Sequence, residues 1–316
     1  MAEDLATAAA TVARLRTALN GVVLGKPAVV DQALVALLGE GHLLIEDVPG
    51  VGKTLLARAI AKSLACVFHR LQFTPDLLPS DILGGNVYKQ LTGEFEFVPG
   101  PLFANVVLAD EINRASPRTQ SALLEAMNSA EVSLDGVTRP LPRPFLVLAT
   151  LNPYEFEGTY ALPESQLDRF MLRISLGYPA REHERRLLAD HRGGEPVEQL
   201  HAVATAADMR QLQAAVRTVT VDAAVADYLL DIVHATREHP EIALGASTRG
   251  ALLLYRAAQA LAVLRGRDFA VPDDVKELAA PVLAHRMAAK RAAPGGNAAA
   301  AEAALASILR DLPPPE

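Results

Sequence analysis

Short apolar segments alternate with helical stretches from near the start of this 316-residue chain to about residue 180, and no other feature constrains the fold as much. Each apolar segment has the length of a β-strand, and turns and stretches with helical spacing separate it from the next. This alternation is typical of an α/β domain, in which helices cover both faces of a parallel sheet. The expected strands are 42–46, 67–73, 106–109, 145–149 and 171–175, and the clearest helices between them are 53–66 and 117–130.

The strand-like segments end near residue 181, and the pattern beyond it predicts helices. Ser247 is suited to capping the start of one helix, and Pro272 is suited to the first turn of another. We expect a parallel-sheet domain over 1–180, an all-helical domain over 181–290, and an Ala- and Pro-rich tail over 291–316 with room for one short helix. The expected helices of the second domain are 208–217, 222–238, 247–265 and 272–286.

Two hairpin inserts are expected within the first domain, near 86–98 and 131–141. Thr92-Gly93 marks the turn of the first insert, and Asp135-Gly136, a strong signal for a two-residue hairpin turn, marks the second. Hairpins are common surface excursions, and the sequence leaves open whether these two have any further role.

Composition argues against several classes of protein. Half of the residues are hydrophobic, so the chain can bury a sizeable core, yet no apolar run reaches the roughly 18 residues that cross a bilayer. The net charge of −7 and the absence of tryptophan argue against nucleic acid as the main partner. Cys66 is the single cysteine, and the acidic N-terminus lacks a signal-peptide pattern, so we expect a cytoplasmic protein.

A strand, a glycine-containing turn and a helix follow one another over 43–66, which is the context of a phosphate-binding loop. Glycines in the turn let backbone N–H groups point at phosphate oxygens, and the helix adds the positive end of its dipole. Lys53 is placed to pair with the β- and γ-phosphates, and the Thr54 hydroxyl is placed to bind Mg²⁺. The competing interpretation is a tight turn beside a solvated lysine. The candidate nucleotide-binding residues are Pro49, Gly50, Val51, Gly52, Lys53, Thr54 and Leu55.

Two further expected strands end in polar residues. Asp110 and Glu111 close the strand 106–109, where Asp110 suits Mg²⁺ and Glu111 suits the base that activates an attacking water. Asn152 follows the strand 145–149 and is suited to orienting a water near the γ-phosphate. Taken alone, a solvated strand end and an asparagine that opens a turn explain these residues as well. The phosphate-binding loop upstream favours the catalytic interpretation.

Several longer segments resemble the AAA+ ATPases, and specifically their MoxR family, over nearly the whole chain. They are QFTPDLLPSD (72–81), LADEINRA (108–115), TQSALLEAM (119–127), GTY (158–160), LPESQLDRF (162–170), GRD (266–268) and VLAHR (282–286). The resemblance implies a P-loop NTPase fold, with a parallel-sheet AAA+ domain and a C-terminal all-helical lid domain, that binds ATP and Mg²⁺. Two positions depart from the usual pattern: Asp47 stands where the loop usually begins with glycine, and Leu151 stands where the family usually has glutamine.

The resemblance also implies roles for four residues outside these strand ends. Arg169 resembles the arginine finger that stabilises charge on a neighbouring subunit's γ-phosphate, and its alternative is a salt bridge to a nearby carboxylate. Arg249 resembles the sensor-2 arginine of the lid, and its alternative is a surface arginine at a helix start. Val23 and Gly25 lie in a segment that resembles the lining of the adenine pocket.

An arginine finger acts on a neighbour, so the resemblance implies a homo-oligomeric ring, expected to be a hexamer. It further implies a chaperone-like motor that remodels or matures a client protein, together with a von Willebrand factor A-domain protein. Two alternatives stay open at this point: an ATP-gated binding or scaffold module with little hydrolysis, and a chelatase-type motor subunit.

Overall fold

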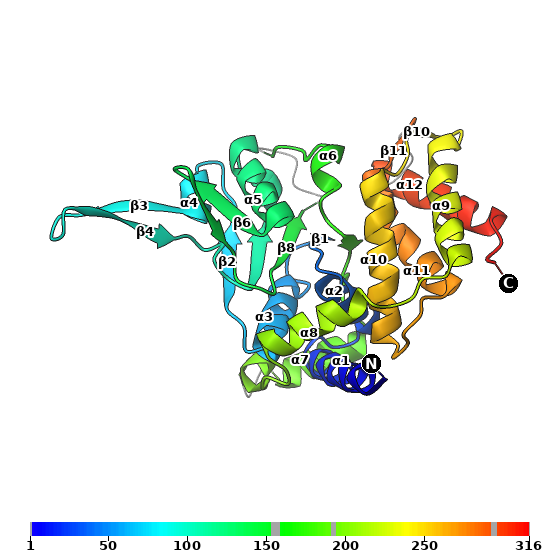
Figure 1. Ribbon diagram of the computed structural model, residues 1–316, viewed down its shortest axis with the longest axis horizontal. Coiled ribbons are helices and arrows are strands. Elements are labelled where there is room, and N and C mark those ends of the chain that lie inside the picture. Colours follow the sequence, from blue (N-terminus) through cyan, green and yellow to red (C-terminus); the bar gives the residue numbers. More distant parts are fainter. Residues whose placement is uncertain (1, 153–158, 191–193, 292–295, 316) are drawn as a thin grey trace.

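The computed structural model describes residues 2–152, 159–190, 194–291 and 296–315, so Gly158 of the GTY segment lies outside the described residues. Its α/β part is built on a five-stranded parallel sheet in the order β2-β5-β8-β1-β9 (Figure 1). The strands are β1 (Leu43–Glu46), β2 (Phe68–Gln72), β5 (Val106–Asp110), β8 (Leu146–Leu151) and β9 (Leu172–Ile174). Each lies within two residues of the range expected for it, so the parallel-sheet prediction is confirmed.

Helices cover both faces of this sheet because its central strands are apolar except near their carboxyl ends. Successive residues of a strand point to opposite faces. Val106 and Leu108 belong to the core under α1, α2 and α3, whereas Val107 and Ala109 belong to the core under α5. These helices are α1 (Ala2–Val22), α2 (Pro27–Leu38), α3 (Lys53–Ser63) and α5 (Pro117–Ser129).

Both expected hairpins form outside the main sheet. The short helix α4 (Pro79–Leu83) leads into the hairpin of β3 (Gly84–Lys89) and β4 (Glu94–Pro99), which projects far from the body of the molecule (Figure 1). The second hairpin joins β6 (Glu131–Leu134) to β7 (Val137–Pro140). Asp135 and Gly136 have φ values of 53° and 77°, as a type I′ turn requires.

The remainder of the chain is helical, as expected, apart from one small sheet. Its longer helices gather on one side of the molecule (Figure 1). Two short strands, β10 (Ile242–Leu244) and β11 (Ala288–Ala289), pair antiparallel there, and the Lys290 N–H extends the contact to the carbonyl of Glu241. The helical elements are α7 (Arg181–Asp190), η3 (Pro196–Gln199), α8 (Ala206–Val216), α9 (Ala223–Glu238), α10 (Thr248–Leu264), α11 (Pro272–Leu283), η4 (Ala284–Arg286) and, in the tail, α12 (Gly296–Asp311).

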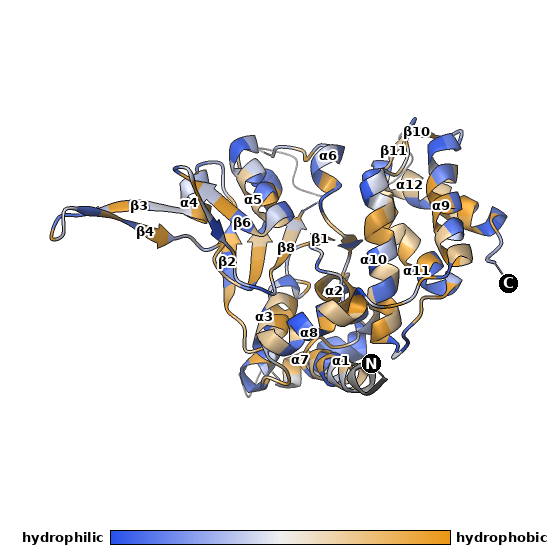
Figure 2. Cartoon of the chain, in the orientation of Figure 1, coloured by the Kyte–Doolittle hydropathy of each residue, from blue (hydrophilic) through white to orange (hydrophobic). Residues whose placement is uncertain are grey.

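The N-terminal helices connect the sheet to this helical part. Helix α10 packs against both α1 and α2. Leu19 of α1, Leu34 of α2 and Leu254 of α10 belong to one continuous buried core, which also contains Leu43 of the sheet. Figure 2 shows orange, hydrophobic segments on the projecting hairpin. Within the described ranges, no helix has both the length and the apolar character needed to span a bilayer.

Candidate nucleotide-binding and hydrolysis site

A pocket of about 420 Å³ opens at the carboxyl ends of the central strands. In parallel sheets with helical crossovers, this edge is where ligands usually bind. The pocket brings together nine of the residues singled out in the sequence, from three separate segments of the chain. They are Pro49, Gly50, Gly52, Lys53, Thr54 and Leu55 from the loop and the start of α3, Asp110 and Glu111 at the end of β5, and Asn152 after β8.

Two glycines give the loop between β1 and α3 its shape. Gly50 has a φ of 84°, and Gly52, the N-cap of α3, has a φ of 101°. Side chains are strained at such angles, whereas glycine adopts them freely. The conformation places the N-terminus of an 11-residue helix at the pocket, where unpaired N–H groups and the helix dipole favour an anion.

Asp47, the departure from the usual loop pattern, anchors the start of this loop. Its Oδ2 accepts hydrogen bonds from the Gly177 N–H at 2.7 Å and the Ser175 hydroxyl at 3.0 Å, beyond the end of β9. Its N–H donates to the Leu151 carbonyl at 3.2 Å. Asp47 therefore fastens the loop to the strands on both sides of it. Leu151 contributes only its backbone carbonyl to this contact, and any residue at that position would supply the same carbonyl.

Lys53 is half-buried among carboxylates. Its Nζ donates to the carbonyl oxygen of Asp47 at 2.8 Å, which holds the side chain across the loop. Burial lowers the pKa of the Lys53 ammonium, and the negative charges of Asp110, Asp47 and Glu111 partly oppose that shift. An anionic phosphate in the pocket would also raise the pKa of Lys53 and so favour its charged form.

Thr150, a residue missed in the sequence, connects the two carboxylate-bearing residues. Its hydroxyl donates to Asp110 Oδ1 at 2.6 Å and accepts from the Glu111 N–H at 2.8 Å. It is fully buried on β8, beside the end of β5. Glu111 has a φ of 57°, an uncommon value for a non-glycine residue, and this turn carries its side chain away from the line of the strand.

Strand β2 supplies two more residues that the sequence analysis did not identify. Arg70 Nη2 donates to Asp110 Oδ2 at 2.7 Å, and Gln72 Nε2 donates to Glu111 Oε2 at 2.8 Å. Both line the pocket. They are two residues apart on one strand, so they share a face of the sheet. The polar residues of β2, an edge strand, were a signal of this, because the central strands β5 and β8 are apolar over most of their length.

The donor set fits Mg²⁺. Mg²⁺ is usually held by one or two protein oxygens together with substrate phosphates and water. The Thr54 hydroxyl and the Asp110 carboxylate both line the pocket and supply such oxygens. Among the described residues there is no group of three or more His, Cys, Asp or Glu side chains that could hold a metal without a phosphate.

Three predicted nucleotide-binding residues do not line this pocket in the part of the chain that the structure describes: Val23, Gly25 and Val51. Val23 is buried in the core, and Val51 packs against that core from its edge. Gly25 has a φ of 72°, and a Cβ placed there would lie 2.7 Å from Nδ1 of His183 on α7. Its segment is therefore in close contact with α7, whose Leu187 does line the pocket.

Arg169 and Arg249 also lie outside the lining of their own chain's pocket, as far as the described residues show. Arg169 follows α6 (Glu164–Leu167), and its Nη1 donates to the Leu124 carbonyl on α5 at 2.7 Å. Arg249 is exposed in the first turn of α10. The segments that carry them are in contact, because the hydroxyl of Ser247 donates to Asp168 Oδ1 at 2.9 Å.

Comparisons with known proteins agree with this geometry. The family described as "ATPase family associated with various cellular activities (AAA)" matches residues 42–172, and the AAA lid domain matches residues 234–307. YeaC of Bacillus subtilis is 51% identical over 269 residues, which are 85% of this chain and 84% of YeaC. Chaperone MoxR1 of Mycobacterium tuberculosis is 43% identical over 295 residues, covering 90% of this chain and 78% of MoxR1.

The fold has a near match among solved structures. A crystal structure of a Cytophaga hutchinsonii protein superposes with a TM-score of 0.91 at 37% identity, and the match covers 99% of this chain and 98% of that one. Protein MoxR of Paracoccus denitrificans is 34% identical over 85% of this chain. These similarities extend over both the sheet and the helical part, and they include the loop and the strand ends that form the pocket. The chain belongs to the MoxR family of AAA+ ATPases.

Proposed function

We propose that this chain hydrolyses ATP with Mg²⁺ and uses the nucleotide cycle to remodel or mature a client protein, as a cytoplasmic homo-oligomeric ring, with a hexamer as the proposed stoichiometry. The convergence of Lys53, Asp110, Glu111 and Asn152 on one pocket supports hydrolysis. A module that only binds ATP needs the phosphate loop, but it has no use for a carboxylate and an amide aimed at an attacking water.

Each pocket residue has a distinct part in this proposal. The loop N–H groups and Lys53 bind the β- and γ-phosphates, and Thr54 and Asp110 hold Mg²⁺, which neutralises charge that develops on the phosphate oxygens. Glu111 takes a proton from the attacking water, and Asn152 orients that water. Gln72 donates to one oxygen of the Glu111 carboxylate at 2.8 Å, and a carboxylate has further lone pairs that can accept from water.

Substitution of Glu111 by glutamine tests the hydrolytic step. Glu111→Gln keeps the shape of the side chain and removes the base, so ATP should still bind while phosphate release falls by about 10²-fold or more. Turnover should be followed as phosphate release, and binding as the Kd of a fluorescent ATP analogue. The matched control is Glu125→Gln, an exposed glutamate on α5 that should change neither value. Turnover unchanged in Glu111→Gln would contradict the role of Glu111.

We further propose that Arg169 and Arg249 act on the nucleotide of the neighbouring subunit. Their position outside the pocket of their own chain supports this. Arg169→Ala subunits keep an intact pocket, and Lys53→Ala subunits keep an intact finger. Each should be nearly inactive alone, with a loss of about 10³-fold for the finger variant. Mixing the two should restore phosphate release. A mixture no more active than its components would exclude a shared site.

The proposed action on a client protein rests on two arguments. One is the resemblance to the family, and the other is the projecting hairpin, on which Leu91 and Phe95 are exposed to solvent. The proposed partners are a client protein and a von Willebrand factor A-domain protein. Affinity capture with the Glu111→Gln variant in ATP, followed by mass spectrometry, should enrich them. The control is the same capture without nucleotide. Identical protein sets with and without ATP would contradict nucleotide-controlled client binding.

A further inference from the structure

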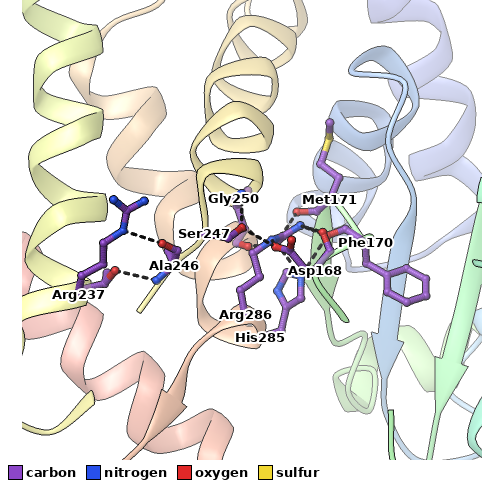
Figure 3. A network of polar contacts seen from close by, with 11 residues as sticks. Asp168, Phe170, Met171, Arg237, Ala246, Ser247, Gly250, His285 and Arg286 are labelled. Carbon is purple, nitrogen blue, oxygen red and sulfur yellow. Dashed lines mark hydrogen bonds and ion pairs between the residues drawn. The ribbon is translucent and has the colours of Figure 1, made fainter. Parts of the chain in front are cut away.

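Arg286 is an arginine of the helical part whose guanidinium contacts both its own helical part, at the Val282 carbonyl, and a segment of the α/β part. It closes η4, directly after α11, and its side chain is only 1% exposed. Its donors contact the segment 168–171, which contains Arg169 (Figure 3). Nε donates to Asp168 Oδ1 at 3.0 Å, and Nη2 donates to the Asp168 carbonyl at 3.2 Å and to the Phe170 carbonyl. Nη1 donates to the Met171 carbonyl at 3.4 Å.

Asp168 receives a second contact from the helical part. The Ser247 hydroxyl donates to the same Oδ1 at 2.9 Å, and its oxygen caps α10 by accepting from the Gly250 N–H at 3.0 Å. Figure 3 shows the two contacts meeting at the carboxylate from different directions. Gly250 allows α10 to pass close by, because a Cβ there would lie 3.1 Å from Cδ of Arg286. The carboxylate of Asp168, the residue before Arg169, is therefore bound to both η4 and α10.

The electrostatics make this link selective for arginine. Burial lowers the pKa of Arg286 to about 10, against the opposing charge of Asp168, so the guanidinium is charged at neutral pH. Arg249 contributes to the same lowering, which places its charge near Arg286. A buried cation is stable only when its donors are paired. A guanidinium has five fixed donors that can satisfy several carbonyls at once, whereas a lysine ammonium has three.

We propose that Arg286 is a positioning residue that locks the segment 168–171 to the lid, so that Arg169 and Arg249 are presented to the neighbouring subunit as one unit. This inference rests on the proposed action of these two arginines in trans. It assigns a function to the VLAHR segment, which no step of hydrolysis within one chain uses. A movement of the lid would shift the finger with it, because the lid residue Arg286 is paired with Asp168, the residue directly before Arg169.

Arg286→Met tests this link, because methionine fills part of the space and cannot bind the carboxylate. Phosphate release by the ring should fall by about 10²-fold, the loss expected when a catalytic group is misplaced by about 1 Å. The Kd for ATP should stay within about twofold, because the pocket of the same chain is intact. Arg286→Lys should recover only part of the activity. Wild-type turnover in Arg286→Met would overturn the proposal.

Mixed rings separate positioning from simple loss of structure. Arg286→Met subunits should be rescued by Lys53→Ala subunits, which supply a correctly held finger. They should not be rescued by Arg169→Ala subunits, which lack the finger. The double variant Arg169→Ala with Arg286→Met should be no slower than Arg169→Ala alone, because both changes disable one unit. Rescue by both partners, or by neither, would overturn the proposal.

Two further variants keep the test decisive. Arg267→Met removes an arginine from a buried ion pair with Asp274 inside the lid, 2.7 Å apart, and serves as the matched control that should keep its turnover. If Arg286→Met does not fold, Ser247→Gly replaces it, since glycine is an acceptable N-cap but cannot donate to Asp168. It should show the same rescue pattern in milder form. If Arg169→Ala keeps wild-type turnover, the trans action and this link both fail. If Arg169→Ala alone is impaired, only the link fails.

Discussion

At the scale of single residues, Thr150 supports the proposed hydrolytic site from outside the lining of the pocket. Thr150→Val keeps the side-chain volume but leaves Asp110 Oδ1 and the Glu111 N–H without their partner. We expect the free energy of unfolding to fall by about 1–3 kcal/mol and turnover to fall by about tenfold. Denaturant unfolding and phosphate release measure the two effects. Thr119→Val, at a fully buried threonine away from the pocket, should lower stability while turnover persists. Equal turnover losses in the two variants would contradict a specific role.

His42 is a residue-scale source of acid sensitivity. The Val147 N–H donates to its Nδ1 at 3.1 Å, so Nε2 carries the proton and donates to the Met127 carbonyl at 2.9 Å. Burial lowers the pKa of His42 from 6.5 to about 4. The unfolded chain therefore binds a proton that the folded chain does not, and stability falls as the pH drops from about 6.5 towards 4, by about 3 kcal/mol in all.

His285 adds to this loss, because burial, and then the charge of Arg286, hold its pKa well below the ordinary value. Urea unfolding at pH 7.5 and pH 4.5 measures the difference. His42→Gln should show a smaller decline between the two pH values than the wild-type chain. His234→Gln, at an exposed histidine of α9, should show the full decline. If the free energy of unfolding of His42→Gln fell as much as that of the wild-type chain, His42 would not be a source of the acid sensitivity.

The sequence predicted those site residues whose position follows from local pattern. Lys53 begins a helix, Asp110 ends a strand and Asn152 follows another strand. The parallel pairing of the strands then brings all three residues to one edge of the sheet. Thr150 and the anchoring role of Asp47 were missed because their partners lie 39 to 130 residues away in the chain. A threonine in an apolar strand has no local signature of the hydrogen bonds it makes across the sheet.

At the scale of elements, the β3–β4 hairpin adds little to stability. Leu91, in its turn, is fully exposed, and Phe95 is largely exposed. Leu91→Ser should therefore leave the free energy of unfolding within about 0.5 kcal/mol of the wild-type value and leave basal ATP turnover unchanged. Leu123→Ala, at a buried residue of α5, should cost about 2–5 kcal/mol in the same unfolding assay. A large loss from Leu91→Ser would show that the hairpin packs on something in solution.

Elements were predictable where hydrophobic periodicity was strong. The five strands of the sheet agree with their expected ranges. So do the helix that Ser247 caps and the helix that has Pro272 in its first turn. The β10–β11 pair was missed because strands of two and three residues contain too few positions to show an alternation. The pairing depends on tertiary packing that brings 242–244 and 288–289 together, and no local pattern encodes that.

At the scale of the whole molecule, the proposed sharing of the site between subunits would make activity depend on assembly. Specific ATP turnover should fall on dilution in step with the loss of the ring. Light scattering coupled to size exclusion measures assembly at the concentrations used for the phosphate assay, and the phosphate assay measures turnover. Salt that dissociates the ring should have the same effect at fixed concentration. A monomer with full specific activity would contradict the ring.

The core that α10 shares with α1 and α2 also limits how such chains can recombine during evolution. A lid taken from a related protein would have to pack against Leu19 and Leu34, which in this chain pack with α10. Chimaeras made by exchanging only the C-terminal part should therefore lose packing at that junction. Exchanges that also carry α1 and α2 should keep it, although the whole sequence of the sheet lies between those helices and the lid.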